Sequence, residues 1–259
     1  MAGLEKFNLN SETQGIESLG IRYGHIVELM KYYCGDESYD PVKIIEIGSW
    51  VGASAITWGN SVKSYCPHGG SVFCIDPWAE MWFNPIFHTP AALQQQFFYM
   101  ENNIFEVFRQ NVSAANLSDM IVPLRGKSED ILPGQPDDYF DIVYIDGNHW
   151  AQSVVQDISL AMPKIREGGI ICGDDLELQA HEVDRKELYF YAINKIDYVN
   201  DTASGIAYHP GVTLGVSTMF GSVGVMDGFW FMKKQSNKWV EFEFPRDSSP
   251  PIYIVTPQQ

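Results

Sequence analysis

Residues 43–54 read KIIEIGSWVGAS, and they give the clearest local indication of the fold. A mostly apolar run over 43–47 ends at Gly48, and the small residues after it lead into a segment of helical periodicity that reaches about Ser64. Glycine permits the sharp reversal that joins a strand to a helix. We interpret the stretch as a strand, a tight turn and a helix, the first unit of a parallel sheet covered by helices.

Further apolar runs follow, and segments of helical periodicity separate them. The runs are residues 71–75, 121–124, 140–145 and 170–172. Their alternation predicts an α/β fold with a Rossmann-like, mostly parallel sheet and helices on both faces. We expect Gly168 and Gly169 to end the helix that begins near Trp150. Apolar stretches within 229–244 predict a final antiparallel hairpin.

One domain is expected over residues 1–259, because no repeat or low-complexity tract interrupts the pattern. It begins with a helical N-terminal segment, 1–40, in which apolar residues of 16–33 share one helical face. Residues 77–92 are aromatic and interrupted by prolines, so we expect a loop that is a candidate lid. Its aromatic residues pack either over an acceptor or on the domain or an oligomer interface, and they are Trp78, Trp82, Phe83 and Phe87.

The net charge limits the partners of this chain. Lys and Arg number 17 against 33 Asp and Glu, which gives a formal charge of −16. A surface this acidic repels phosphate, so we expect neither a nucleic acid nor an anionic membrane as a partner. The N-terminus lacks the pattern of a signal sequence, and no apolar run reaches membrane length. We therefore expect a soluble, cytoplasmic protein.

The four cysteines give no sign of a metal or disulfide site. Cys34, Cys66, Cys74 and Cys172 form no C-x-x-C pair, and the last two lie in apolar, strand-like runs. We therefore expect neither zinc nor a disulfide framework, in agreement with a reducing cytoplasm.

Polar residues gather where the expected strands end. Ligands of open parallel sheets bind beyond the carboxyl ends of the strands. The five ends carry Gly48, Asp76, Gly126, Asp146 and the pair Asp174–Asp175. The candidate site is therefore expected at this edge of the sheet.

The glycine turn favours one class of cofactor over another. A dinucleotide site needs G-x-G-x-x-G, and Trp50 stands where the second glycine would be, which disfavours NAD and an oxidoreductase. An acidic residue before the turn, Glu46, suits a ligand with a cationic amine, and Asp76 can accept hydrogen bonds from both hydroxyls of a ribose. The alternative is that Gly48 and Gly52 only permit a tight turn.

Carboxylates follow two adjacent strands of the expected sheet. Asp146, Asp174 and Asp175 should converge, and clustered anions are costly unless a positive group joins them. Oxygen ligands with room for water favour Mg²⁺ or Mn²⁺. The alternative is that Asp146 and Asp175 cap the following helices. His149 lies three residues after Asp146 and either takes a proton from a metal-acidified hydroxyl or is a polar histidine at a helix start.

Together these motifs resemble a known family. The turn at 46–54, combined with Asp76, resembles class I S-adenosylmethionine (SAM)-dependent methyltransferases. Residues 144–149, YIDGNH, and 163–175, PKIREGGIICGDD, resemble the metal-dependent O-methyltransferases. Within these, the closest likeness is to the macrocin and mycinamicin type of sugar enzymes and their relatives, which include cephalosporin hydroxylase-like proteins. The resemblance covers about residues 42–175 and continues more weakly to 244.

The resemblance implies a topology, a metal, a base and a cofactor site. The sheet would have seven strands in the order 3-2-1-4-5-7-6. Mg²⁺ or Mn²⁺ would bind to Asp146, Asp174 and Asp175, and His149 would be the general base. SAM would contact the first turn and the strand ends that follow it, at Glu46, Gly48, Ser49, Gly52, Ser54, Asp76, Pro77, Trp78, Gly126, Ser128 and Asp146.

The implied reaction transfers a methyl group from SAM to a hydroxyl of a small-molecule acceptor, with a vicinal diol on a sugar or glycosylated natural product favoured. The alternatives are a metal-independent SAM methyltransferase acting on nitrogen or carbon, a hydroxylase-associated component, and a non-catalytic SAM-binding subunit. A homo-oligomer is compatible with each of them. His88, His181 and His209 are isolated in the sequence and are expected to be structural or surface residues.

Overall fold

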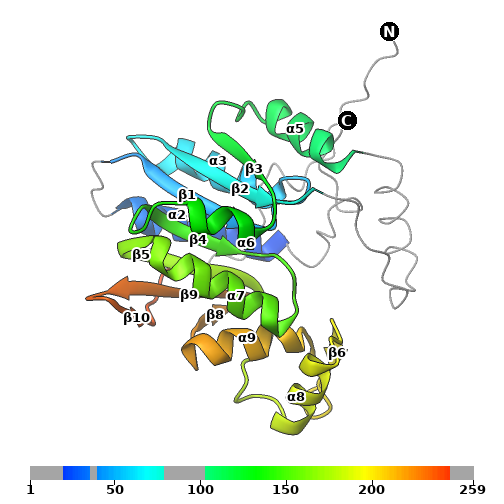
Figure 1. Ribbon diagram of the computed structural model, residues 1–259. Helices are drawn as coiled ribbons and strands as arrows, with labels where there is room; N and C mark the ends of the chain where they lie inside the picture. Colours follow the sequence, from blue (N-terminus) through cyan, green and yellow to red (C-terminus); the bar gives the residue numbers. More distant parts are fainter. Residues whose placement is uncertain (1–19, 36–39, 79–102, 246–259) are drawn as a thin grey trace.

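The computed structural model describes residues 20–35, 40–78 and 103–245 (Figure 1). The candidate lid, apart from Pro77 and Trp78, lies outside the described residues, as do His88 and more than half of the N-terminal segment. The extent of the domain and the closing of a lid therefore stay predictions.

An eight-stranded sheet forms the centre of the described structure (Figure 1). Its strands are β1 (Val42–Ile47), β2 (Gly70–Asp76), β3 (Ile121–Arg125), β4 (Phe140–Ile145), β5 (Ile165–Leu176), β8 (Gly224–Met226), β9 (Gly228–Gln235) and β10 (Lys238–Val240). They lie in the order β3-β2-β1-β4-β5-β9-β10, and β8 also pairs with β9. The strands from β1 to β5 pair in parallel, whereas β9 runs antiparallel to β5.

The predicted α/β class and Rossmann-like strand order are confirmed. In the expected order 3-2-1-4-5-7-6, β9 takes the place of strand 7 and β8 that of strand 6. The sheet has one strand more than expected, because β8 pairs only with Phe229–Phe231 and leaves Lys233–Gln235 to pair with β10. This β9–β10 pair is the predicted final hairpin. The short strands β6 (Val199–Asn200) and β7 (Ala207–Tyr208) form a separate two-stranded sheet.

Helices cover both faces of the large sheet (Figure 1). They are α2 (Gly20–Gly35), α3 (Ala53–Tyr65), α5 (Ile104–Ala114), α6 (Ser128–Ile131), α7 (Ala151–Ala161), α8 (Arg185–Ile193) and α9 (Pro210–Phe220). Successive residues of β1 point to opposite faces, so Ile44 packs in the core with Trp58 of α3 and Ile45 in the core with Ile158 of α7. The two cores hold the sheet between helical layers, and its carboxyl edge is where a site can form.

The helix after β4 ends earlier than predicted. α7 stops at Ala161, a 3-10 turn covers Met162–Lys164, and Ile165 is already the first residue of β5. Pro163 prevents continuation of the helix because it lacks a backbone N–H group. Gly168, which is expected to end the helix, lies inside β5 instead, with a φ of +80°.

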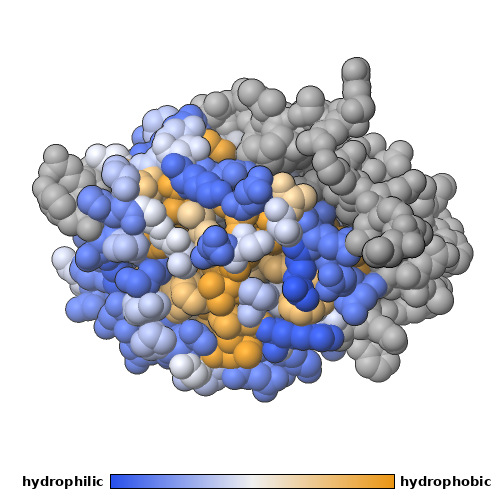
Figure 2. Space-filling model, turned by 90° about the horizontal axis from the view of Figure 1, so that it is seen from above, coloured by the Kyte–Doolittle hydropathy of each residue, from blue (hydrophilic) through white to orange (hydrophobic). Residues whose placement is uncertain are grey.

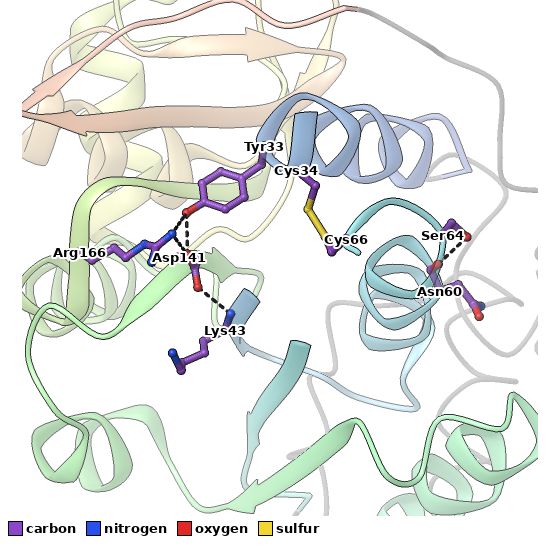
Figure 3. Close-up of a disulfide and its surroundings, with 8 residues drawn as sticks. All are labelled: Tyr33, Cys34, Lys43, Asn60, Ser64, Cys66, Asp141 and Arg166. Carbon is purple, nitrogen blue, oxygen red and sulfur yellow. Dashed lines mark hydrogen bonds and ion pairs between the residues drawn. A yellow bond between two sulfur atoms is a disulfide. The ribbon is translucent and has the colours of Figure 1, made fainter. Parts of the chain in front are cut away.

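A disulfide joins Cys34, near the end of α2, to Cys66, which follows α3 (Figure 3). The expectation of no disulfide is wrong. The two residues are 32 positions apart, and only the packing of α2 against α3 brings their Cα atoms to 5.3 Å. Cys74 and Cys172 are buried free thiols, in agreement with their apolar surroundings in the sequence. Disulfides are rare in a reducing compartment, so this bond does not favour the expected cytoplasm.

Beside the disulfide, a buried network fastens the end of α2 to the sheet (Figure 3). The Tyr33 hydroxyl donates to Asp141 Oδ1 at 2.6 Å, and the guanidinium of Arg166 pairs with the same carboxylate. The backbone N–H of Lys43 donates to Asp141 Oδ2 at 2.6 Å. Since Asp141 lies in β4, Arg166 in β5 and Lys43 in β1, the C-terminal end of α2 is held against three strands.

The described surface is mixed in character. Viewed from above, it shows a hydrophobic area surrounded by hydrophilic residues (Figure 2). Among the described residues, every helix is too short or too polar to span a lipid bilayer.

Removal of the disulfide is expected to destabilise the fold. The double variant Cys34→Ser, Cys66→Ser should lose about 3–4 kcal/mol of unfolding free energy, because the bond closes a loop across a separation of 32 residues and so restricts the unfolded chain. Urea unfolding at equilibrium measures this loss. A reducing agent should destabilise the wild type by the same amount and leave the double variant unaffected; an unchanged midpoint for the reduced wild type would contradict the prediction.

Candidate functional site

The carboxyl ends of the parallel strands meet at one edge, as predicted. The backbone N–H of Gly48 donates to Ile75 O at 2.9 Å, and that of Asp146 donates to Ile47 O at 2.9 Å, so β1 ends between β2 and β4. A β-carbon on Gly48 would lie 1.9 Å from the carbonyl oxygen of Asp146, and the φ of Gly48 is +89°. Only glycine satisfies both the conformation and the close approach of the neighbouring backbone.

Glu46 is a buried acidic residue directly before this turn. Its side chain is fully buried, and neither carboxylate oxygen has a hydrogen-bond partner among the described residues; the Ser49 hydroxyl is in the same situation. Burial raises the pKa of Glu46 to about 7. Buried acceptors without partners are costly, so this end of the turn is suited to a ligand that donates hydrogen bonds. Gly52, with a φ of +96°, leads into α3, whose first turn contains the buried Ser54.

Asp76 is fixed at the end of β2. Its Oδ2 accepts from the backbone N–H of Trp50 at 2.9 Å and its Oδ1 from that of Trp78 at 2.6 Å. Burial raises the pKa of Asp76. The indole of Trp78 donates to the carbonyl of Trp50 at 2.6 Å and packs against Phe105 and Phe108. Trp78 is expected to pack either over an acceptor or on the domain or an oligomer interface. In the structure it packs on the domain.

Of the other residues predicted to bind the cofactor, Gly126 lies beside Asp76, whereas the side chain of Ser128 contacts another residue. The N–H of Gly126 donates to Asp76 O at 3.0 Å, which brings the end of β3 beside Asp76. The Ser128 hydroxyl instead donates to Asp157 of α7, whose pKa burial raises to about 6. Pro77 is exposed. Gly126 thus joins the edge around Asp76, whereas the hydroxyl of Ser128 is already occupied.

Arg22 of α2, which no sequence motif marks, lies among the carboxylates at the end of β5. Its Nη1 donates to Asp174 Oδ1 at 2.6 Å and to Asp175 Oδ1 at 2.8 Å, and its Nη2 donates to Glu177 Oε1 at 2.7 Å. Burial would lower the pKa of Arg22, but these three carboxylates raise it further, so the guanidinium is charged. The positive group that clustered anions require is therefore present in the chain itself.

His149 lies between two carboxylates. Its Nε2 is 3.0 Å from Asp175 Oδ2, and its Nδ1 is 3.0 Å from Asp197 Oδ1. Burial would lower the pKa of His149, but Asp175 and Asp197 raise it well above its ordinary value. Burial likewise would raise the pKa of Asp175, but His149, His209 and Arg22 hold it well below its usual range. The two carboxylates therefore favour the protonated imidazole, which can donate from both nitrogens.

His209, which is expected to be a structural or surface residue, lies beside His149, so it is not isolated in the structure. Its Nδ1 lies 3.1 Å from Glu177 Oε2, and its ring meets that of His149 edge-on with 4.5 Å between centroids. The ring of Tyr198 packs on it at 4.7 Å. His181 is exposed, as expected. The histidine–carboxylate cluster, as we call it below, consists of Asp146, His149, Asp174, Asp175, Glu177, Asp197 and His209.

The strand ends described above lie in a region that matches a family of known proteins. Residues 45–176, half of the chain, match the family model described as a methyltransferase domain. The chain belongs to this family. The prediction of a SAM-dependent methyltransferase is thus confirmed at the level of the family. No curated protein matches the methyltransferase in sequence.

Solved structures resemble the methyltransferase at low sequence identity. A protein from Corynebacterium glutamicum is 12% identical, with 87% of this chain and 90% of that chain covered and a TM-score of 0.50. Cofactor-bound Rv0187 from MTB is 18% identical over 81% and 77% of the chains (TM-score 0.47). An O-methyltransferase from Bacillus cereus in complex with SAH is 19% identical over 83% and 79% (TM-score 0.46). The first of these likenesses extends over most of both chains and is a likeness of fold.

Asp146 is the member of the histidine–carboxylate cluster whose backbone meets the glycine turn of the methyltransferase. Burial raises its pKa well above the ordinary value, and the charges of Asp174 and Asp175 add to this. The Tyr144 hydroxyl donates a long hydrogen bond, 3.4 Å, to Asp146 Oδ2. The alternative of helix capping does not apply to Asp146, because α7 begins after Trp150.

The expected metal ligands are not assembled as one set. Among the described residues, the groups that could hold one ion are His149–Asp197–His209, Asp146–His149–Asp175 and Asp175–Glu177–His209. Asp174 is in none of these groups, and it shares the Nη1 of Arg22 with Asp175. The three aspartates therefore do not fit Mg²⁺ in this arrangement, since a guanidinium already bridges two of them.

Proposed function

We propose that this methyltransferase transfers the methyl group of SAM to a hydroxyl oxygen of a small molecule. One observation carries the proposal: the glycine turn, with Glu46 unpartnered and Asp76 fixed, shares a sheet edge with a buried histidine–carboxylate cluster. The turn suits the cofactor, and the cluster suits removal of a proton from an acceptor.

The chemistry of the turn suits SAM, which supplies an activated methyl group when bound. Glu46 would accept hydrogen bonds from the amino group, whose positive charge would stabilise this buried carboxylate. Gly48 would hold the turn in this conformation, because only glycine fits beside the carbonyl of Asp146. Asp76 would accept from the ribose hydroxyls, because the N–H groups of Trp50 and Trp78 occupy only one lone pair on each of its oxygens.

Substitution of Asp76 by alanine should therefore weaken cofactor binding. Two hydrogen bonds to a charged group contribute about 3 kcal/mol or more, which corresponds to about a 10²-fold loss of affinity for S-adenosylhomocysteine (SAH). Calorimetric titration with SAH measures it. The exposed Asp119→Ala is the matched control and should bind as the wild type does. An Asp76→Ala protein that is folded and binds SAH normally would refute this placement of the ribose.

The acceptor end offers an aromatic surface beside titratable groups. Tyr198 is 53% exposed and packs on His209, which in turn contacts His149. A sugar ring packs well on an exposed aromatic face, and adjacent hydroxyls of a vicinal diol can reach neighbouring polar groups. We therefore favour a vicinal diol of a sugar or glycosylated natural product as the acceptor class.

His149 is the proposed proton acceptor. With SAM bound, its methyl group would pass from sulfur to the acceptor oxygen and leave SAH. His149 would take the hydroxyl proton at a ring nitrogen from which the acceptor has displaced one of the two carboxylates. Only a neutral imidazole can take this proton, and Asp175 and Asp197 both favour the charged form. The competent form of His149 is therefore a minority at neutral pH and increases as the pH rises.

An acceptor panel tests the proposal. The wild type is incubated with SAM and a set of vicinal-diol sugars, catechols, the corresponding mono-ethers and primary amines, and products are identified by mass spectrometry. We expect SAH release and one added methyl group on oxygen for diols alone. Methylation of amines would favour the alternative that acts on nitrogen, and SAH binding with no product on any acceptor would favour a non-catalytic SAM-binding subunit.

A further inference from the structure

The surroundings of Arg22 are built to receive its guanidinium. The main-chain carbonyl of Asp227 accepts from Nε at 2.9 Å, in addition to the three carboxylates that accept from the other two nitrogens. Gly228 leaves the necessary space, because a β-carbon there would lie 2.7 Å from Nη2 and 2.8 Å from Cζ. Each guanidinium nitrogen therefore has an acceptor, and the side chain is only 9% exposed.

The helix that carries Arg22 is fixed at several points. Its C-terminal end is tied by the Cys34–Cys66 disulfide and by the hydrogen bond of Tyr33 to Asp141 (Figure 3). Closer to Arg22, His25 is fully buried, and its Nε2 lies 2.9 Å from Asp227 Oδ2. The placement of Arg22 is thus a property of the packed domain.

The guanidinium lies where a bridging cation would lie. Nη1 contacts one oxygen of Asp174 and one of Asp175, which are consecutive residues at the end of β5. A divalent ion that bridged the same oxygens would either displace the buried guanidinium of Arg22 from two of its three carboxylates or stay beside it and be repelled. Both courses are unfavourable.

We propose that Arg22 is the built-in cation of the histidine–carboxylate cluster and that it excludes a divalent metal from Asp174 and Asp175. It follows that methyl transfer needs no metal ion bound to Asp174 and Asp175, a consequence that rests on the proposed function, whereas the exclusion itself does not. Arg22 is a positioning residue: it holds Asp175 Oδ1, so that Asp175 Oδ2 faces Nε2 of His149.

Titration of Mn²⁺ into the full chain tests the exclusion directly. We expect no saturable Mn²⁺ binding by the wild type at millimolar concentrations and none by Arg22→Lys, which keeps a positive charge. Arg22→Gln removes the charge and should gain one Mn²⁺ site per chain. The proposal is overturned if the wild type binds one Mn²⁺ per chain with micromolar affinity, or if the wild type and Arg22→Gln bind it equally.

A second variant displaces Arg22 without changing any charge. Gly228→Ala puts a methyl group against the guanidinium and should bind Mn²⁺ as Arg22→Gln does. Gly221→Ala is the matched control, because Gly221 also has a positive φ, +78°, but nothing lies within 4 Å of its added β-carbon. It should exclude Mn²⁺ as the wild type does. If a variant fails to fold, the wild-type titration alone decides.

SAH titration and a chelator separate this inference from the proposed function. Binding of SAH together with turnover that persists in EDTA supports both. Binding of SAH with turnover that EDTA abolishes and Mn²⁺ restores overturns the inference and leaves the proposed function intact. Absence of SAH binding overturns the proposed function, and the Mn²⁺ titration then still decides whether Arg22 excludes the metal.

Discussion

His149→Ala is expected to lower kcat by about 10²- to 10⁴-fold, because it removes the proposed proton acceptor. The affinity for SAH should stay unchanged, since Glu46 and Asp76 lie at the glycine turn and are not altered. Turnover at saturating SAM, measured beside the SAH dissociation constant, separates the two effects. His181→Ala, which changes an exposed histidine of the described chain, is the matched control and should retain full activity.

If His149 is the proton acceptor, kcat should change with pH in one definite direction. Asp175 and Asp197 raise the pKa of His149, so the imidazole becomes neutral only as the pH rises past that raised value. Wild-type kcat should therefore increase above neutral pH. Asp197→Asn removes one of the two carboxylates, and the increase should begin at a lower pH. A profile that is flat over this range, or that is the same in Asp197→Asn, would contradict the role of His149.

The second large effect is expected at Gly48. Gly48→Ala should lose about 1–2 kcal/mol of stability from its positive φ. It should lose about 1–3 kcal/mol more because the added β-carbon would lie 1.9 Å from Asp146 O and force β1 and β4 apart. Since the turn presents the cofactor residues, SAH affinity should fall as well. Thermal and urea unfolding, followed by SAH titration of the folded protein, measure both losses.

Gly168→Ala isolates the contribution of the close approach at Gly48. Gly168 has a similar φ, +80°, but nothing lies within 4 Å of the position of its β-carbon. It should therefore show the loss that comes from φ alone and bind SAH normally. Equal destabilisation in the two variants, with normal SAH binding in both, would show that the strand ends at Gly48 are not in the described contact.

The fold could be predicted from the sequence where local patterns dominate. The apolar runs that became β1 to β5 and the glycine turn at Gly48 are local signals, and the order of the sheet followed from the family resemblance. α7 ends before the predicted Gly168–Gly169 because Pro163 already stops it. The edge of the sheet at β8 and β10 depends on pairing between short strands, which local patterns barely mark.

The candidate site was predictable only where strand topology fixes it. Asp76, Asp146 and His149 follow strands that end together, so their proximity could be expected. Arg22 was not predictable, because 152 residues separate it from Asp174 and only tertiary packing brings them together. Clustered carboxylates indicate a cation, but no local pattern distinguishes a metal ion from an arginine on a distant helix.

The same limit applies to the histidines and cysteines. His209 appeared isolated in the sequence, yet it contacts His149 because the segment after β5 folds back over the strand ends. Cys34 and Cys66 lack a recognisable spacing, and their bond depends on how α2 packs on α3. Contacts that form only through tertiary packing leave no local pattern in the sequence, so these contacts could not be predicted from it.

A crystal structure of the wild-type protein with SAH tests the central claim most directly. We expect SAH at the carboxyl ends of β1 and β2, with the ribose hydroxyls on the Asp76 carboxylate, the amino group toward Glu46 and the sulfur on the side of His149. SAH bound at another edge of the sheet, or bound here without contact to Asp76, would contradict it.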